Sequence, residues 1–93
     1  MTISEIKSTV MKVVSLYPIK KVTLFGSRAD GTNKEDSDID LIVEFSAPVT
    51  LIVLGNLKAQ LEDMFNLEVD IIHGPLQNTD IIEVNREIEL YAA

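Results

Sequence analysis

Hydrophobic residues near the N-terminus recur three or four positions apart, which is the spacing of an amphipathic helix. The residues that form this stripe are Ile3, Ile6, Val10, Val13, Val14 and Tyr17. Thr2 and Glu5 match a capping box, in which the threonine and glutamate side chains satisfy each other's backbone N–H groups. Pro18 lacks a backbone N–H and ends a helix. The pattern therefore predicts a helix over residues 3–16.

Three short runs of β-branched, aliphatic and aromatic residues predict strands. They cover residues 21–25, 37–45 and 67–72. Each run is closed by residues that favour turns, namely Gly26, Ser46-Ala47-Pro48 and His73-Gly74-Pro75. Residues 27–36, between the first two strands, are mostly small, polar or charged. We expect a loop or a short helix there.

A second long helix is predicted after Thr50, which is a favourable helix cap. Its apolar stripe consists of Leu51, Leu54, Leu57, Leu61, Met64 and Phe65, and we interpret it as core, with part of it available to a partner. A last helix is predicted over residues 80–89, and Leu90-Tyr91 is predicted to form a short terminal strand. The order α-β-β-α-β-α predicts an α/β (α+β) fold, a small mixed sheet with helices packed on it, as one domain spanning 1–93.

Composition limits the classes of protein to consider. The 93 residues suffice for one domain, and 46% of them are hydrophobic, which is typical of a globular protein. The net charge of −7 argues against direct nucleic-acid binding, which normally needs a basic patch. No apolar run approaches the roughly 20 residues of a membrane helix, and the N-terminus lacks the order of a signal peptide. A soluble cytoplasmic protein without a membrane partner is expected.

Two aspartates, Asp38 and Asp40, interrupt the second predicted strand. Side chains alternate along a strand, so both carboxylates are expected on one face, where they repel each other and lose solvation. A cation between them best explains such a pair. Asp70 interrupts the third predicted strand in the same way, and the three carboxylates are expected at one sheet edge. Oxygen-only ligands suit Mg²⁺ or Mn²⁺, and two such ions about 4 Å apart support phosphoryl or nucleotidyl displacement.

Gly26 and Ser27 supply a second part of that chemistry. Glycine after a strand lets a phosphate approach the backbone closely, and the Ser27 hydroxyl can bond phosphate oxygens. Arg28 offers a charge-assisted contact to the same anion, or equally a surface pair with Glu35 or Asp36. These residues are candidates for nucleotide binding.

Gly26-Ser27, ten intervening residues and then Asp38-Ile39-Asp40 resemble the signature of the nucleotidyltransferase superfamily that includes DNA polymerase β and kanamycin nucleotidyltransferase. Gly-Ser-Arg-Ala, Ser-Asp-Ile-Asp-Leu and Val-Asp-Ile are most similar to its minimal nucleotidyltransferase (MNT) branch. The resemblance covers nearly the whole chain and implies a polymerase β-like fold and two-metal transfer of a nucleoside monophosphate. It implies that Asp38 and Asp40 bind both metals. It also implies that Asp70 completes the metal site and helps to deprotonate the acceptor hydroxyl.

The same resemblance assigns Gly26 and Ser27 to the triphosphate of the substrate, for which ATP is the family-based expectation. Asp30 departs from the family, because many relatives carry a basic residue there, and this weakens the assignment of Arg28. Members of the branch are commonly paired with HEPN-domain toxins. The resemblance therefore implies an antitoxin that transfers AMP to a partner tyrosine, binds the toxin, or does both. Transfer to a small molecule is a third possibility, and a homo-oligomer and a heterocomplex both stay open.

The same residues also allow simpler interpretations. Asp36, Asp38 and Asp40 could begin a calcium loop, but Leu41 and Ala47 occupy positions where that loop needs glycine and glutamate. The aspartates could also lie at a solvated strand end. His73 is expected to have a loop or surface role, and both tyrosines, Tyr17 and Tyr91, are expected to pack.

Overall fold

A computed structural model describes residues 1–75 and 87–93 and confirms a small mixed α/β fold. The helices are α1 (Ile3–Val13), the 3₁₀ helix η1 (Val14–Leu16), α2 (Ser27–Asp30) and α3 (Leu51–Phe65). The strands are β1 (Ile19–Phe25), β2 (Ile39–Phe45), β3 (Val69–His73) and β4 (Ile88–Ala92). Across the described ranges, no helix has both the length and the hydrophobicity needed to cross a membrane.

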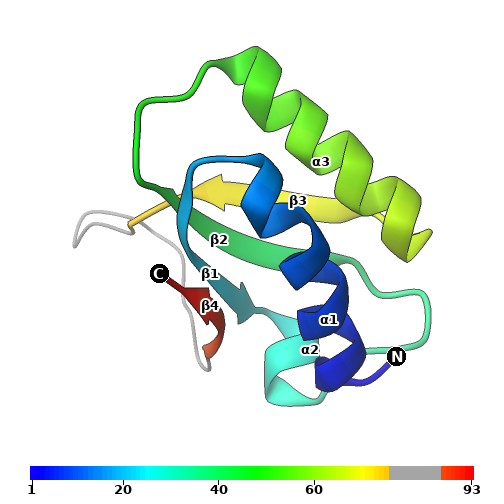
Figure 1. Ribbon diagram of the computed structural model, residues 1–93. Coiled ribbons are helices and arrows are strands. Elements are labelled where there is room, and N and C mark those ends of the chain that lie inside the picture. Colours follow the sequence, from blue (N-terminus) through cyan, green and yellow to red (C-terminus); the bar gives the residue numbers. More distant parts are fainter. Residues whose placement is uncertain (76–86) are drawn as a thin grey trace.

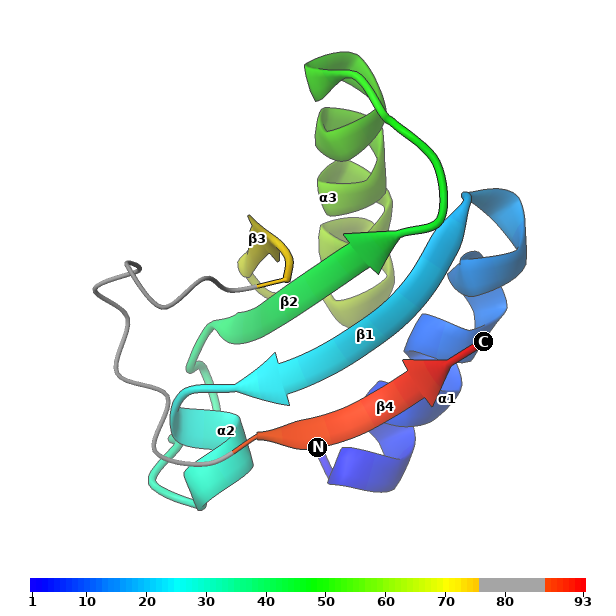
Figure 2. The ribbon, with the colours of Figure 1, turned by 90° about the vertical axis from the view of Figure 1, so that its left-hand side faces the viewer.

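The four strands form one sheet in the order β3-β2-β1-β4. β1 pairs antiparallel with β2 and with β4, whereas β2 and β3 are parallel. A parallel pair needs a long crossover, and α3 supplies it. Helices α1 and α3 cover one face of the sheet (Figure 1), and the view in Figure 2 shows α2 beside the end of β1. β2 therefore lies between β1 and β3, and a side chain on β2 has neighbours on both sides.

The start of α1 follows the predicted capping box. The Thr2 hydroxyl accepts a hydrogen bond from the Glu5 N–H, and Glu5 Oε1 accepts one from the Thr2 N–H, both at 3.1 Å. The helical path predicted over 3–16 consists of α1 followed by η1. Its end before Pro18 confirms the predicted stop, because proline has no N–H to continue the helical hydrogen bonds.

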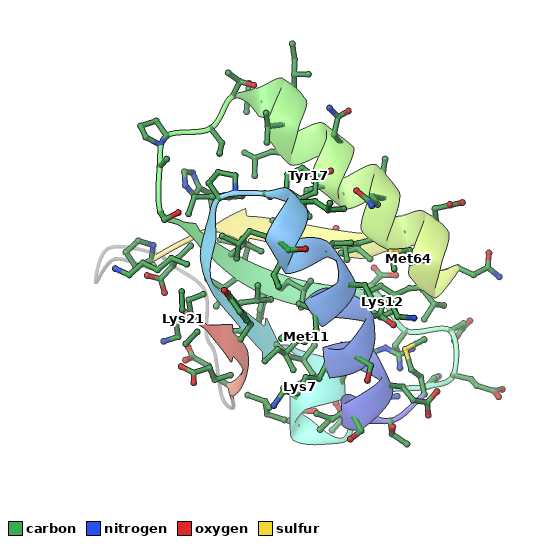
Figure 3. The ribbon with its side chains drawn as sticks, viewed as in Figure 1. Lys7, Met11, Lys12, Tyr17, Lys21 and Met64 are labelled. Atoms are coloured by element: carbon green, nitrogen blue, oxygen red, sulfur yellow. The ribbon has the colours of Figure 1, made fainter. Side chains whose placement is uncertain are left out.

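The core lies between the helices and the sheet. Its most deeply buried members are Ile6, Val10 and Val13 of α1, Leu57 and Leu61 of α3, and Val22, Leu24, Ile39, Leu41, Val43 and Val69 of the sheet. Tyr17 also packs against this core, and its hydroxyl donates a hydrogen bond to Gln60 Oε1 at 2.9 Å. Figure 3 shows Tyr17 next to α3. The packing role predicted for Tyr17 is thus confirmed.

The apolar stripe of α3 contributes to the core only in part. Leu57, Leu61 and Phe65 are buried, but Leu51 is 85% exposed and Met64 is 39% exposed. The first turns of α3 extend beyond the strands, so their apolar side chains have no sheet beneath them (Figure 1). The prediction that the stripe is core is therefore correct for Leu57, Leu61 and Phe65, whereas Leu51 and Met64 form an exposed part of the stripe.

Two further predictions need correction. β2 begins at Ile39, so Ser37 and Asp38 precede the strand that was predicted to contain them. A last helix was predicted over residues 80–89. Residues 80–86 lie outside the described part of the chain, and the prediction is wrong at its end, because Ile88 and Glu89 belong to β4. These two residues pair with Leu24 and Thr23 of β1, and this long-range pairing overrides the local preference for a helix. The short terminal strand at 90–91 is confirmed and is longer than predicted.

Candidate active site

Gly26 lies at the junction of β1 and α2 and has a backbone that only glycine adopts readily, with φ 74° and ψ −156°. A Cβ atom built on Gly26 would collide with Oδ2 of Asp40 and would lie 3.2 Å from its Cγ. The absence of a side chain thus lets the Asp40 carboxyl lie directly against the backbone of Gly26. Ser27 follows as the first residue of α2 and is half-buried beside this contact.

Asp40 and Asp70 face each other across two neighbouring strands. They are direct partners in the parallel register of β2 and β3, and on the other side Asp40 pairs with Phe25 of β1. Asp40 therefore lies between Asp70 and the end of β1, where Gly26 follows. The sheet register alone brings together residues that are 14 to 44 positions apart in the sequence.

The environment of Asp40 raises the pKa of its carboxyl from the ordinary value of 3.8 to about 6. Burial is the main cause, because it disfavours the charged form. The charge of Asp70, a hydrogen bond between the Asp40 and Asp70 carboxyls, and the charge of Asp38 act in the same direction. A proton held between two carboxyls occupies a place that a cation would favour.

The three predicted carboxylates converge only in part. Asp38 precedes β2 and acts on Asp40 through its charge, and residues 1–75 and 87–93 contain no group of three acidic or histidine side chains arranged to hold a metal ion. The Asp40–Asp70 pair nevertheless fits Mg²⁺ or Mn²⁺, because Mg²⁺ is usually bound by one or two carboxylates together with water and substrate phosphate. The close pair of hard oxygen donors is the observation on which this fit depends.

The raised pKa of Asp40 predicts how the stability of the metal-free protein depends on pH. The folded state holds the Asp40 proton more tightly than the unfolded state, so its contribution is complete below about pH 4 and is lost as pH rises through about 6. We expect the free energy of unfolding to fall across this interval by on the order of 1 kcal/mol, since solvent screens a half-buried carboxyl. Denaturant unfolding at pH 4, 5, 6 and 7 measures it.

The matched variant for this measurement is Asp40→Asn, which cannot titrate. The difference in the free energy of unfolding between wild type and variant isolates the contribution of Asp40 from that of the other carboxylates. We expect the wild type to lose stability relative to the variant between pH 4 and 6. Parallel pH profiles for the two proteins would show that Asp40 titrates normally. Added Mg²⁺ should raise the stability of the wild type above pH 6, where the carboxyl is free to bind a cation.

Arg28 does not form the surface pair that was one of its two expected roles. Its side chain is buried, with 5% exposure, and is directed at the loop before β2. Nε donates to the Ser37 carbonyl at 3.1 Å, and Nη2 donates to the carbonyls of Ser37 and Glu35 at 2.9 and 3.1 Å. The guanidinium of Arg28 thus donates hydrogen bonds to the backbone carbonyls of Glu35 and Ser37. Among the described residues, no ion pair joins Arg28 to the side chain of Glu35 or Asp36. Its expected contact to a substrate phosphate stays a prediction.

Sequence reasoning missed the two carbonyls that Arg28 binds. Every residue carries a backbone carbonyl, so Glu35 and Ser37 give no signal of this role in the sequence. His73 matches its expectation, being exposed at the end of β3, where its ring contacts Phe45 edge-on with centroids 5.3 Å apart. The catalytic, nucleotide-binding and metal roles of all the candidate residues, Arg28 included, stay predictions.

Residues 6–91 match the family model described as "Nucleotidyltransferase domain". Among curated proteins, a relative from Methanocaldococcus jannaschii is 39% identical over 72 residues, which cover 77% of this chain and 77% of the relative. That relative is named "Putative protein adenylyltransferase MJ0435". The family match thus spans β1, α2, β2 and β3, which together carry the candidate site.

Solved structures share the fold. A toxin–antitoxin complex with AMP-PNP superposes with a TM-score of 0.78 at 21% identity, covering 94% of this chain and 73% of that chain. A complex of a tri-AMPylated Shewanella oneidensis HEPN toxin with its MNT antitoxin superposes with a TM-score of 0.69 at 18% identity, covering 97% of this chain and 72% of that chain. At these identities the likeness is one of fold.

Proposed function

The chain belongs to the nucleotidyltransferase domain family, in its minimal nucleotidyltransferase branch, and on this basis we propose that it is a protein adenylyltransferase that acts as an antitoxin. It transfers AMP from ATP to a tyrosine hydroxyl of a HEPN-type toxin and requires Mg²⁺ or Mn²⁺. The fold shared with MNT antitoxins in complexes with HEPN toxins supports this choice of partner.

The main support for the proposal is the pairing of Asp40 with Asp70 directly beside Gly26 and Ser27. Two carboxyls forced together lower stability at neutral pH unless a cation or a proton lies between them. A domain that served only to bind a partner would gain nothing from this pair. An enzyme that handles a triphosphate gains a cation site next to a glycine that admits a phosphate closely.

In the proposed mechanism, Asp40 and Asp70 would hold the divalent cation, with Asp38 as a further ligand. When bound, the cation supplies a Lewis acid that neutralises charge on the phosphates. Gly26 leaves space for the triphosphate beside the strand end, and the Ser27 hydroxyl donates a hydrogen bond to a phosphate oxygen. Asp70 accepts the proton of the tyrosine hydroxyl. That oxygen then bonds to the α-phosphorus of ATP, the bond from this phosphorus to the bridging oxygen breaks, and pyrophosphate leaves.

A second candidate function is neutralisation of the toxin by binding alone. The exposed Leu51 and Ile52 at the start of α3, 85% and 77% exposed, favour it, because apolar side chains in the open suit a protein interface. The net charge of −7 would also suit a basic, RNA-cleaving partner.

Intact-mass measurement of the partner separates these candidates. A HEPN-domain protein from the same organism is incubated with this protein, ATP and Mg²⁺, and a mass gain in whole AMP units is expected. Peptide mapping is then expected to place the gain on tyrosine. A stable complex that neutralises the toxin without any mass gain would overturn the proposed transfer and leave the binding function.

A further inference from the structure

The loop between α2 and β2 is held by its own hydrogen bonds. Asp30 Oδ1 accepts bonds from the Thr32 N–H at 2.9 Å and from the Thr32 hydroxyl at 2.6 Å. The Lys34 N–H donates to Ser37 Oγ at 2.7 Å, and the Ser37 N–H donates to the Lys34 carbonyl at 3.2 Å. Ser37 is thus fixed through its side chain and its N–H, one residue before Asp38.

The remaining polar group of Ser37 is its carbonyl, which accepts hydrogen bonds from Nε and Nη2 of Arg28 at 3.1 and 2.9 Å. Nη2 also donates to the Glu35 carbonyl at 3.1 Å. A buried charge is costly unless it is hydrogen-bonded, so moving the guanidinium away from these carbonyls would be unfavourable. Arg28 directly follows Ser27 in α2. These bonds therefore link the turn beside the candidate phosphate site to the backbone that leads into Asp38 and Asp40.

We infer that Arg28 is a positioning residue, whose guanidinium sets the position of Asp38 relative to Ser27 and thereby the affinity of the site for divalent cations. The inference rests on the cation requirement of the proposed function. It is an alternative to the expectation that Arg28 binds a substrate phosphate. Groups behind metal ligands commonly change metal affinity by 10- to 100-fold, because they orient the ligating oxygens.

The rigid shape of the guanidinium makes this role testable. Its planar fork reaches the carbonyls of Glu35 and Ser37 together, whereas a lysine ammonium is a single point on a flexible stem. Arg28→Lys keeps the charge and removes the fork. A phosphate contact would largely survive this change, while the positioning role would be lost.

The experiment titrates wild type and Arg28→Lys with Mn²⁺ and follows free Mn²⁺ by electron paramagnetic resonance. We expect binding to weaken about tenfold in the variant. In the AMP-transfer assay the Mg²⁺ concentration for half-maximal rate should rise by the same factor, while KM for the partner protein stays unchanged. Equal Mn²⁺ affinity in both proteins, or a rise in KM for ATP alone, would overturn the inference.

Lys34→Gln is the matched control, because it removes an exposed positive charge from the same loop without changing the bonds of Arg28. It should bind Mn²⁺ like the wild type.

If Arg28→Lys does not fold, Ser37→Ala tests the same loop by removing the bond from the Lys34 N–H, and it should weaken Mn²⁺ binding about threefold. Unchanged binding in Ser37→Ala would also overturn the inference. Wild-type protein that binds Mn²⁺ but transfers no AMP would overturn the proposed function alone, and wild-type protein that binds no Mn²⁺ would overturn the inference.

Discussion

Asp40→Asn is expected to reduce AMP transfer to the partner by about a thousandfold or more. Asp40 is the carboxyl that lies between Asp70 and the backbone of Gly26, so its replacement removes a charged oxygen from the centre of the cation site. The variant keeps the shape of the side chain. The initial rate of mass gain on the partner, measured at saturating ATP and Mg²⁺, gives the size of the loss.

The same variant should be at least as stable as the wild type at pH 7 without metal, because the repulsion between Asp40 and Asp70 is gone. This combination of lower activity with undiminished stability separates a chemical role from a structural one. Asp63→Asn, which removes an exposed carboxylate from α3, is the matched control and should transfer AMP at the wild-type rate. Activity of Asp40→Asn within tenfold of the wild type would rule out Asp40 as a ligand essential for catalysis.

Gly26→Ala is expected to reduce AMP transfer by at least a hundredfold and to lower the free energy of unfolding by about 2 kcal/mol. The stability loss comes from the backbone conformation of Gly26, which disfavours any side chain. The activity loss comes from the new methyl group, which would occupy the position of Asp40 Oδ2 and push the carboxyl away from Asp70. Thermal unfolding and the mass-gain assay measure the two effects separately.

Gly31→Ala is the control that separates strain from crowding. Gly31 also has a positive φ, 83°, but a Cβ built there meets nothing within 4 Å. It should lose about 1 kcal/mol of stability and keep its transfer activity near the wild-type level. If both variants lost activity equally, backbone strain at the ends of α2 would explain the loss, and the contact between Gly26 and Asp40 would have no special role.

The sequence by itself predicted most of the local structure. The capping box at Thr2 and the stop at Pro18 define the first helical segment, and Thr50 caps α3, accepting a hydrogen bond from the Val53 N–H at 3.3 Å. These features depend on residues a few positions apart, so a short window of sequence contains the information. The mixed sheet was predicted from the order of these elements. The MNT family was predicted from the Gly-Ser and Asp-x-Asp motifs, which are contiguous or nearly so.

Other features depended on contacts between distant parts of the chain. Ile88 and Glu89 form a strand because β1 offers an edge to pair with, and Leu51 is exposed because α3 begins beyond the sheet. Arg28 points inward because the carbonyls of Glu35 and Ser37 surround it, and carbonyls have no sequence signature.

The candidate site shows the same division. The sequence named Gly26, Ser27, Asp38, Asp40 and Asp70, because carboxylates inside apolar runs and a glycine after a strand are unusual by type and position alone. Only the tertiary structure decided that Asp40 and Asp70 form the close pair and that Asp38 stays outside it. The reason is physical: the residue type determines which chemistry a side chain can perform, whereas strand register and burial determine which side chains meet and at what pKa.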